Sequence, residues 1–209
     1  MLAWLKSKKQ VASGLLGIEI GPEGIALAHV QRSPGQPVQL RNCLFRPGTP
    51  EQQPELLKSL VAELGLAGMP VNFVLHPALY QMLLLDCPDV PADELRDALR
   101  WRIKELISEP LEQVQVDAFA LPEDAYRGRS RMAYCAVLGK SHLAGWKALL
   151  KHAGLRLQSI DVTEMAFRNL GLQAGAEGLN LGLLRLRSSE GLICIQQGAD
   201  LYMARRIEQ

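Results

Sequence analysis

The sequence predicts a mixed α/β fold, and three observations near its start support this class. Two apolar strands, 15–21 and 24–31, are joined by a tight Gly-Pro-Glu-Gly turn, which is typical of a hairpin. A helix is expected at 54–64, because its leucines recur every three or four residues. A short apolar run, 71–75, then has the composition of a buried strand. An amphipathic helix placed between strands indicates that the helix covers a sheet.

A third strand, expected at 38–45, completes a meander with the first two. It follows a turn, 33–37, that contains two prolines and a glycine. Pro54 suits the first position of the helix, and Gly65 suits its end. The resulting order, β-β-β-α-β, is the opening of the ribonuclease-H-like fold that actin and its relatives share.

The first hairpin also has the outline of the first phosphate loop of actin-like ATPases. Glu19 stands just before Gly21, the first glycine of the turn, so an acid precedes backbone that could pass under a nucleotide. A hairpin with an acid at its mouth is also common in proteins that bind no nucleotide. This motif alone therefore leaves both interpretations open.

After His76 and Pro77 the pattern changes, and a second subdomain of order β-α-β-β-α is expected. Its elements are strand 81–85, helix 93–107, strands 111–121 and 132–138, and a helix capped by Ser141 and stopped by Gly154. The helix at 93–107 has an apolar stripe that includes Leu106, and Trp101 lies well outside this stripe. An indole there either packs on the adjoining subdomain or helps to form a groove for a partner peptide.

The remaining elements return to the first subdomain and then begin another domain. Asp161 and Glu164 are spaced as the amino-terminal cap of a short helix, 165–172. The strands expected around it are 157–160, 179–186, 192–196 and 201–205. The predicted organisation is a flexible tail (1–14), a first actin-like subdomain (15–80), an inserted subdomain (81–156), a return to the first subdomain (157–178) and the start of a second actin-like domain (179–209).

Composition disfavours several classes of protein. The 209 residues are 48% hydrophobic and 22% charged with a formal net charge of +1, so no basic stripe for nucleic acid is expected. The four cysteines lie far apart without a Cys-x-x-Cys pair, and we interpret them as reduced core residues. No apolar run approaches the roughly 20 residues that cross a bilayer. We therefore expect a cytoplasmic protein without a transmembrane segment.

The first residues offer one candidate contact with a membrane. Met1, Leu2 and Trp4 form an apolar tip before the basic residues Lys6 and Lys8. Such a segment could lie on an anionic bilayer surface. A solvated tail is the simpler interpretation.

Several segments resemble the PilM family of actin-like proteins that assemble type IV pili. The resemblance is carried by 98–105 (ALRWRIKE), 114–120 (VQVDAFA), the opening 17–21 (GIEIG) and the later 154–162 (GLRLQSIDV), in the order of the family. It is diffuse and covers nearly the whole chain. Within the family the loops are most similar to the MshI branch, which serves the mannose-sensitive haemagglutinin (MSHA) pilus. The cytoplasmic part of type II secretion GspL proteins is built similarly and remains an alternative.

The resemblance implies an ATP cleft with one phosphate loop from each of two large domains. Of the residues that would hold metal and phosphate, only Glu19 and Gly21 can be carried over to this chain. In the second loop Arg185 stands where the family has an acid and Arg187 where it has the first glycine. Arginine cannot ligate Mg²⁺, and its bulk fills the turn. With the second domain incomplete at Gln209, we expect no ATP hydrolysis, no metal and no cofactor, although Mg-ATP stays an alternative ligand.

The sequence contains no complete motif for a phosphate-binding loop, a metal site or a hydrolase. Gly139, Lys140 and Ser141 lie between a strand and a helix, but a phosphate loop needs a glycine where Tyr134 stands. The four histidines have no metal-ligand spacing, and the hydrolase motifs Gly-x-Ser-x-Gly and His-Glu-x-x-His are absent from the sequence.

The family resemblance and the degenerate second loop together predict a scaffold rather than an enzyme. Such a protein would bind the cytoplasmic tail of a PilN-like inner-membrane protein, with Arg100 and Trp101 as expected contacts, and would sit at the inner membrane through this partner. The pilus motor ATPase is a further expected partner. Self-association through an exposed strand edge at 201–205 is a structural alternative. A nucleotide-dependent switch of a pilus or type II secretion machine is the alternative function.

Overall fold

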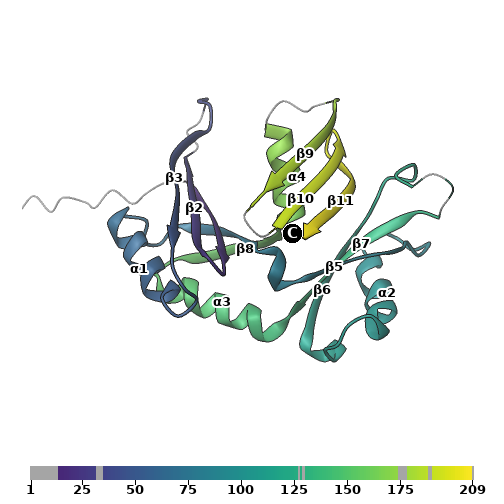
Figure 1. Cartoon of the computed structure of the whole chain (residues 1–209), viewed down its shortest axis with the longest axis horizontal. Coiled ribbons are helices and arrows are strands. Elements are labelled where there is room, and N and C mark those ends of the chain that lie inside the picture. The colour runs from purple at the N-terminus through teal and green to yellow at the C-terminus, as the bar shows by residue number, and fades with distance from the viewer. Residues whose placement is uncertain are drawn as a thin grey trace, which may run out of the picture. The chain divides into compact units, whose positions relative to one another are not determined.

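The computed structural model describes residues 14–31, 35–126, 128, 130–173, 178–187 and 190–208. The expected amino-terminal tail therefore lies outside the described residues except for Gly14. The chain divides into two compact units, Met1–Val74 with Gly145–Ile160 and Leu75–Ala144 with Asp161–Gln209 (Figure 1). The chain thus leaves the first unit, returns to it and leaves it again.

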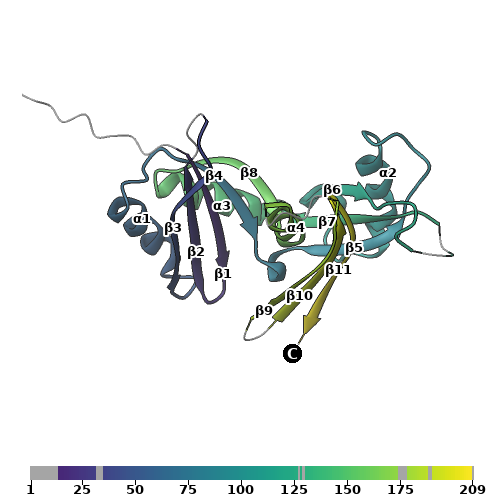
Figure 2. The same cartoon turned by 90° about the horizontal axis from the view of Figure 1, so that it is seen from above.

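The first unit contains a five-stranded sheet with the strand order β3-β2-β1-β4-β8. Figure 2 shows β3, β2 and β1 side by side as the predicted meander. The strands are β1 (Leu15–Gly21), β2 (Gly24–Gln31), β3 (Gln39–Pro47), β4 (Pro70–Leu75) and β8 (Arg156–Val162). The two helices that accompany them are α1 (Gln53–Glu63) and α3 (Lys140–His152).

Alternating side chains of β1 build the core of this unit. Ile18 and Ile20 are buried on one face of the strand, as a half-buried strand requires. Helix α1 adds the buried Leu57, and it is joined to α3 by a hydrogen bond of 3.0 Å between Glu55 and His152. The two helices therefore lie next to each other and cover the same apolar face of the sheet.

The second unit contains two three-stranded antiparallel sheets. One has the order β5-β7-β6 and packs against helix α2 through a shared apolar cluster. The other has the order β11-β10-β9, with helix α4 along one face (Figure 1). The elements are β5 (Gln81–Asp86), α2 (Leu95–Arg102), β6 (Val114–Ala120), β7 (Met132–Gly139), α4 (Thr163–Gln173), β9 (Asn180–Leu186), β10 (Glu190–Gln197) and β11 (Asp200–Glu208).

The predicted α/β class and the order β-β-β-α-β of the first elements are confirmed. Three local predictions are wrong. The helix expected at 93–107 ends as an α-helix at Arg102 and continues as a 3₁₀ turn, which leaves Leu106 exposed instead of in the core. Ser141 lies inside α3, which begins at Lys140, so it is not a cap. Residues 111–113 form a 3₁₀ turn before β6 rather than part of the strand.

The cysteines are less uniform than predicted. Cys135 and Cys194 are buried, whereas Cys43 is exposed because it lies on β3, the outermost strand of its sheet. None of the described helices is both long and apolar enough to span a membrane. The subdomain boundaries predicted from the sequence remain a prediction.

Gly24 is the residue of the first hairpin whose identity the backbone requires. Its φ is +152°, and a Cβ placed on it would lie 2.2 Å from the carbonyl oxygen of Arg46 on β3. Both the backbone conformation and the close strand exclude a side chain. Gly17, on the strand before the turn, has no such neighbour within 4 Å.

We expect Gly24→Ala to lower the free energy of unfolding by about 1–3 kcal/mol, because the strained backbone and the displaced β3 both cost energy. Chemical denaturation followed by circular dichroism measures the change. Gly17→Ala is the matched control and should leave stability unchanged or slightly raised. Equal effects of the two variants would contradict the assigned role of Gly24.

Candidate functional site

The turn between β1 and β2, which corresponds to the first phosphate loop, accepts hydrogen bonds from the start of α1 and from the segment before it. The buried side chain of Gln53 donates from Nε2 to the carbonyl oxygen of Gly21 at 2.7 Å, and Gly48 N–H donates to Glu23 O at 3.0 Å. Glu19 is half-buried on the face of β1 opposite to the core residues Ile18 and Ile20. The sequence pattern identified Glu19 and Gly21 but not Gln53. The sequence shows Gln53 only as a polar residue before Pro54, and nothing there indicates that it reaches the turn.

In the second loop the arginines are used to hold an acid. Arg185 Nη2 lies 2.9 Å from Glu190 Oε1, and Arg187 Nη1 lies 3.8 Å from the same oxygen. His76 Nε2 lies 3.6 Å from it as well. In the β9–β10 hairpin Arg185 pairs with Leu192, so Glu190, two residues before Leu192, is a diagonal neighbour of Arg185. Glu190 is therefore surrounded by three basic side chains.

A metal-bound nucleotide at this loop would compete with these ion pairs. Mg²⁺ in such sites is held by carboxylates and phosphate oxygens, and the acid of this loop is already paired with arginine. Among the described residues there is also no cluster of three His, Cys, Asp or Glu side chains that could hold a metal ion. Arg185, Arg187 and Glu190 instead form an ion-paired group at the facing ends of β9 and β10.

A buried polar cluster lies beside this loop in the same unit. Glu164, at 1% exposure, accepts a very short hydrogen bond from the hydroxyl of Tyr80 and one from Arg206 Nε at 3.1 Å. The guanidinium of Arg206 also lies 4.5 Å from the centre of the Tyr80 ring and donates to Pro77 O at 2.8 Å. Thr163 N–H donates to the Tyr80 hydroxyl at 3.0 Å. The carboxylate is thus neutralised and hydrogen-bonded on both oxygens, as a buried charge must be.

Glu164 was predicted to cap its helix, and this prediction is wrong. The side chain reaches Tyr80 and Arg206 instead, because the energy of pairing a buried charge exceeds that of a helix cap. Burial, followed by the nearby charge of Glu164, raises the pKa of Tyr80. The same two causes raise the pKa of Cys194 to about 12, so this thiol stays protonated and unreactive.

The expected partner-binding residues lie on α2. Trp101 is 73% exposed there, in keeping with its position outside the apolar stripe. Arg100 is partly buried and donates from Nη2 to the carbonyl oxygen of Leu111 at 2.6 Å. The two residues are thus adjacent in sequence but differ in environment, with the indole open to solvent and the guanidinium bound to the fold.

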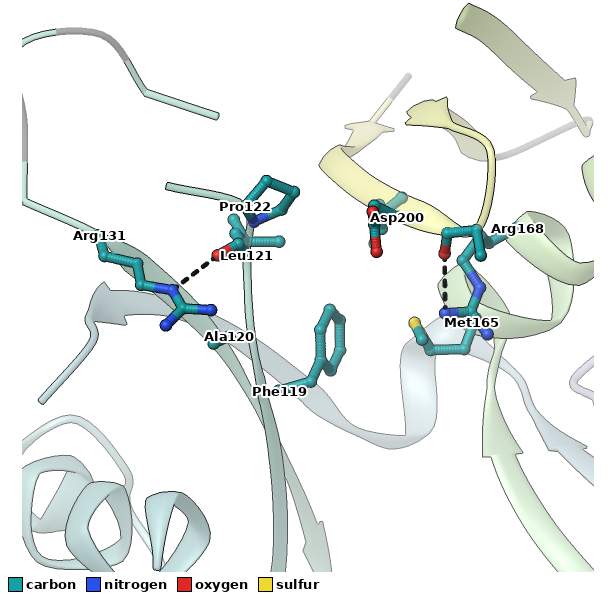
Figure 3. Close-up of a pocket in the computed structure, with 10 residues that line it drawn as sticks. Phe119, Ala120, Leu121, Pro122, Arg131, Met165, Arg168 and Asp200 are labelled. Carbon is teal, nitrogen blue, oxygen red and sulfur yellow. Dashed lines mark hydrogen bonds between the residues drawn. The ribbon is translucent and has the colours of Figure 1, made fainter. Parts of the chain in front are cut away.

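A cavity of about 340 Å³ lies in the second unit, where the end of β6, α4 and the turn between β10 and β11 meet. Figure 3 shows Phe119 and Met165 lining its apolar part, with Arg131 and Arg168 at opposite sides. Both arginines donate to backbone carbonyls, of Leu121 at 3.0 Å and of Ala199 at 3.2 Å respectively. The arginines therefore brace the walls of this cavity.

The strand edge expected to be open at 201–205 is occupied at its middle. The Tyr134 hydroxyl donates to Ala204 O at 2.9 Å and accepts from Ala204 N–H at 3.0 Å. Leu201 is buried. The predicted exposed edge on β11 is therefore wrong at Ala204, where a side chain takes the place of a neighbouring strand.

Replacing Arg206 by leucine should destabilise the protein by about 3 kcal/mol, because the Glu164 carboxylate would be left buried without its cation. Urea unfolding followed by tryptophan fluorescence measures this loss. The matched control is Arg205→Leu, since Arg205 is exposed on the same strand. Similar stability of the two variants would show that the cluster does not depend on its ion pair.

Comparison with known proteins places this geometry in a known architecture. No family model matches the sequence, and no curated protein does. A solved structure of a PilM-PilN type IV pilus biogenesis complex matches with a TM-score of 0.71 and 23% identity, over 93% of this chain and 61% of that one. The cytoplasmic domain of EpsL, an inner-membrane component of the type II secretion system of Vibrio cholerae, matches with a TM-score of 0.63, 12% identity and coverages of 93% and 71%.

A third match is a Bacteroides thetaiotaomicron protein with an actin-like ATPase fold and unknown function. It aligns over 100% of this chain and 74% of its own, with a TM-score of 0.54 and 13% identity. This chain spans 61% of the length of the matched chain from the PilM-PilN complex. These likenesses establish the architecture: the chain has the actin-like ATPase fold predicted from its sequence.

Proposed function

We propose that this protein is a non-catalytic actin-like scaffold of type IV pilus assembly, which binds the cytoplasmic tail of a PilN-like inner-membrane protein. The observation that carries the proposal is the likeness to the PilM-PilN complex over 93% of the chain. The sequence resemblance to the PilM family supports the same assignment. On this proposal the protein works in the cytoplasm, at the inner membrane through its partner.

The finer assignment, to the MshI branch and the MSHA pilus, rests on the loops alone. It is supported by the degenerate second loop, in which Arg185 and Arg187 replace the acid and glycine of the family pattern. The pilus motor ATPase is proposed as a further partner of the same scaffold.

The absence of catalysis is proposed from the ion pairs of the second loop. Glu190 pairs with Arg185 at 2.9 Å, so binding a magnesium ion there would require the release of an existing salt bridge. The first loop retains an acid, Glu19, and the alternative function is therefore an ATP-binding switch of a pilus or type II secretion machine. The likeness to the EpsL domain favours keeping this alternative.

The surface proposed for the PilN-like tail includes Trp101. Exposed tryptophans are over-represented among residues that dominate binding energy, because a large rigid side chain buries much area at low entropic cost. Arg100 contributes by holding α2 to Leu111 and orienting the helix that presents the indole.

Titration calorimetry separates the two functions. We expect the purified chain to bind a peptide of the cytoplasmic tail of a PilN-like membrane protein from the same organism, and to give no saturable heat with Mg-ATP. Saturable Mg-ATP binding without peptide binding would replace the scaffold by the switch. An Arg185→Ala variant is a useful control, because removing its ion pair with Glu190 should not create nucleotide binding in a scaffold.

Replacing Trp101 by alanine should weaken peptide binding at least about tenfold, the loss typical of an aromatic anchor. The folded state should be unaffected, because the indole is exposed, and circular dichroism checks this. Phe45→Ala is the matched control, since Phe45 is an exposed aromatic residue on β3 of the other unit. Unchanged affinity of the Trp101 variant would remove α2 from the proposed surface.

A further inference from the structure

The outer edge of strand β6 carries backbone groups that do not pair with β7. The two strands pair in register, and just past the end of β6 Leu121 N–H donates to Met132 O at 2.8 Å. Hydrogen-bonded pairs alternate with non-bonded pairs along an antiparallel ladder. The N–H and C=O groups of Val116, Ala118 and Ala120 therefore point away from β7, toward the side where the sheet ends.

Side chains of β6 already take some of these groups. Gln115 Nε2 donates to Val116 O at 3.5 Å, and Asp117 Oδ1 accepts from Ala118 N–H at 2.9 Å. Among the residues that the structure describes, none bonds to the outward groups of Ala120 in this way. Ala120 also lines the cavity of about 340 Å³. A ligand in this cavity would therefore find a backbone donor and acceptor at its wall.

Charges of opposite sign belong to the same cavity wall. Arg131 donates from Nε to Leu121 O at 3.0 Å, and its two Nη groups bond to no described residue. Asp200 is exposed at the start of β11, and its carboxylate makes no hydrogen bond or ion pair within the described part of the chain. Figure 3 shows these two side chains on either side of the Phe119 ring.

The third charged residue of the cavity, Arg168, is bound to the fold. It donates from Nη1 to Ala199 O at 3.2 Å and from Nη2 to Asn169 Oδ1 at 2.8 Å. Because Ala199 directly precedes Asp200, these bonds hold the turn that carries the carboxylate. A wall that is held in place before a ligand arrives lowers the entropic cost of binding.

The surface between the two charges is apolar. Phe119 and Met165 line it together with the buried Leu121 and Leu201. Aromatic groups pack favourably on another ring and on a thioether. A ligand with a charge of only one sign would leave either the base or the acid of this cavity unpaired, whereas a zwitterion pairs with both.

We propose that this cavity binds a free aromatic α-amino acid. The α-carboxylate pairs with Arg131, the α-ammonium pairs with Asp200, and the ring lies against Phe119 and Met165. Ala120 supplies a backbone N–H and C=O to the same two charged groups, as it would to a neighbouring strand. A volume of about 340 Å³ is at the lower end of the range for small-molecule pockets, about 300–1,000 Å³. The proposal goes beyond the scaffold function and does not depend on it.

Titration of the purified protein with L-phenylalanine tests the proposal, by calorimetry and by ligand-observed NMR for weak analogues. We expect saturable binding of L-phenylalanine. Binding should be at least about tenfold weaker for L-phenylalaninol, which lacks the carboxylate, and for 3-phenylpropionate, which lacks the ammonium. Equal binding of N-acetyl-L-phenylalanine amide, which carries neither charge, would show that the cavity takes a peptide segment and would overturn the proposal.

Two variants assign the charged groups of the ligand to their partners. Asp200→Asn should weaken the binding of L-phenylalanine at least about tenfold and leave 3-phenylpropionate unaffected, because that compound has no ammonium to lose. Arg131→Gln should weaken L-phenylalanine similarly and leave L-phenylalaninol unaffected. Asp97→Asn is the matched control, since Asp97 is an exposed acid on α2, and it should change nothing.

The methyl group of Met165 reports where the ligand binds. Its NMR signal should shift on addition of L-phenylalanine because of the nearby ring, whereas the signal of Met69, buried in the first unit, should not. The proposal is overturned if L-phenylalanine, L-tyrosine and L-tryptophan all fail to give saturable binding, or if Met165 does not respond. It is also overturned if Asp200→Asn weakens L-phenylalanine and 3-phenylpropionate equally.

Discussion

The buried carboxylate of Glu164 is the constraint on which the second unit depends. A charge at 1% exposure costs several kcal/mol to dehydrate unless a cation and hydrogen-bond donors reach it. Tyr80 and Arg206 satisfy it from segments 84 and 42 residues away. Because apolar packing tolerates sliding and hydrogen bonds to a charge do not, this cluster fixes where the turn before β5, the start of α4 and the strand β11 meet.

Charges in the second loop serve the same structural purpose. Arg185 and Glu190 pair across the mouth of a hairpin, at the place where an actin-like ATPase would need groups free for metal and phosphate. An architecture can persist after its reactive positions have been used for stability, and the scaffold that we propose would be such a case.

The amphipathic elements were predictable from the sequence because their signal is local. The alternation in 15–31 and the spacing of leucines in α1 each reflect a single buried face, and the exposure of Trp101 follows from the same periodicity. Long-range partners left no such trace. Gln53 bonds to Gly21 from 32 residues away. In the sequence Glu164 resembles a helix cap, and only the structure shows that its partners are Tyr80 and Arg206.

The hydroxyl of Tyr134 has a consequence for the solubility of the protein. By serving both backbone groups of Ala204, it removes the point at which a foreign strand could start to pair with β11. Burial raises the pKa of this phenol, so the proton that it donates is retained throughout the physiological range. The Tyr134 side chain thus disfavours edge-to-edge strand pairing at Ala204, the kind of contact from which aggregates grow. It does so without adding charge to the surface.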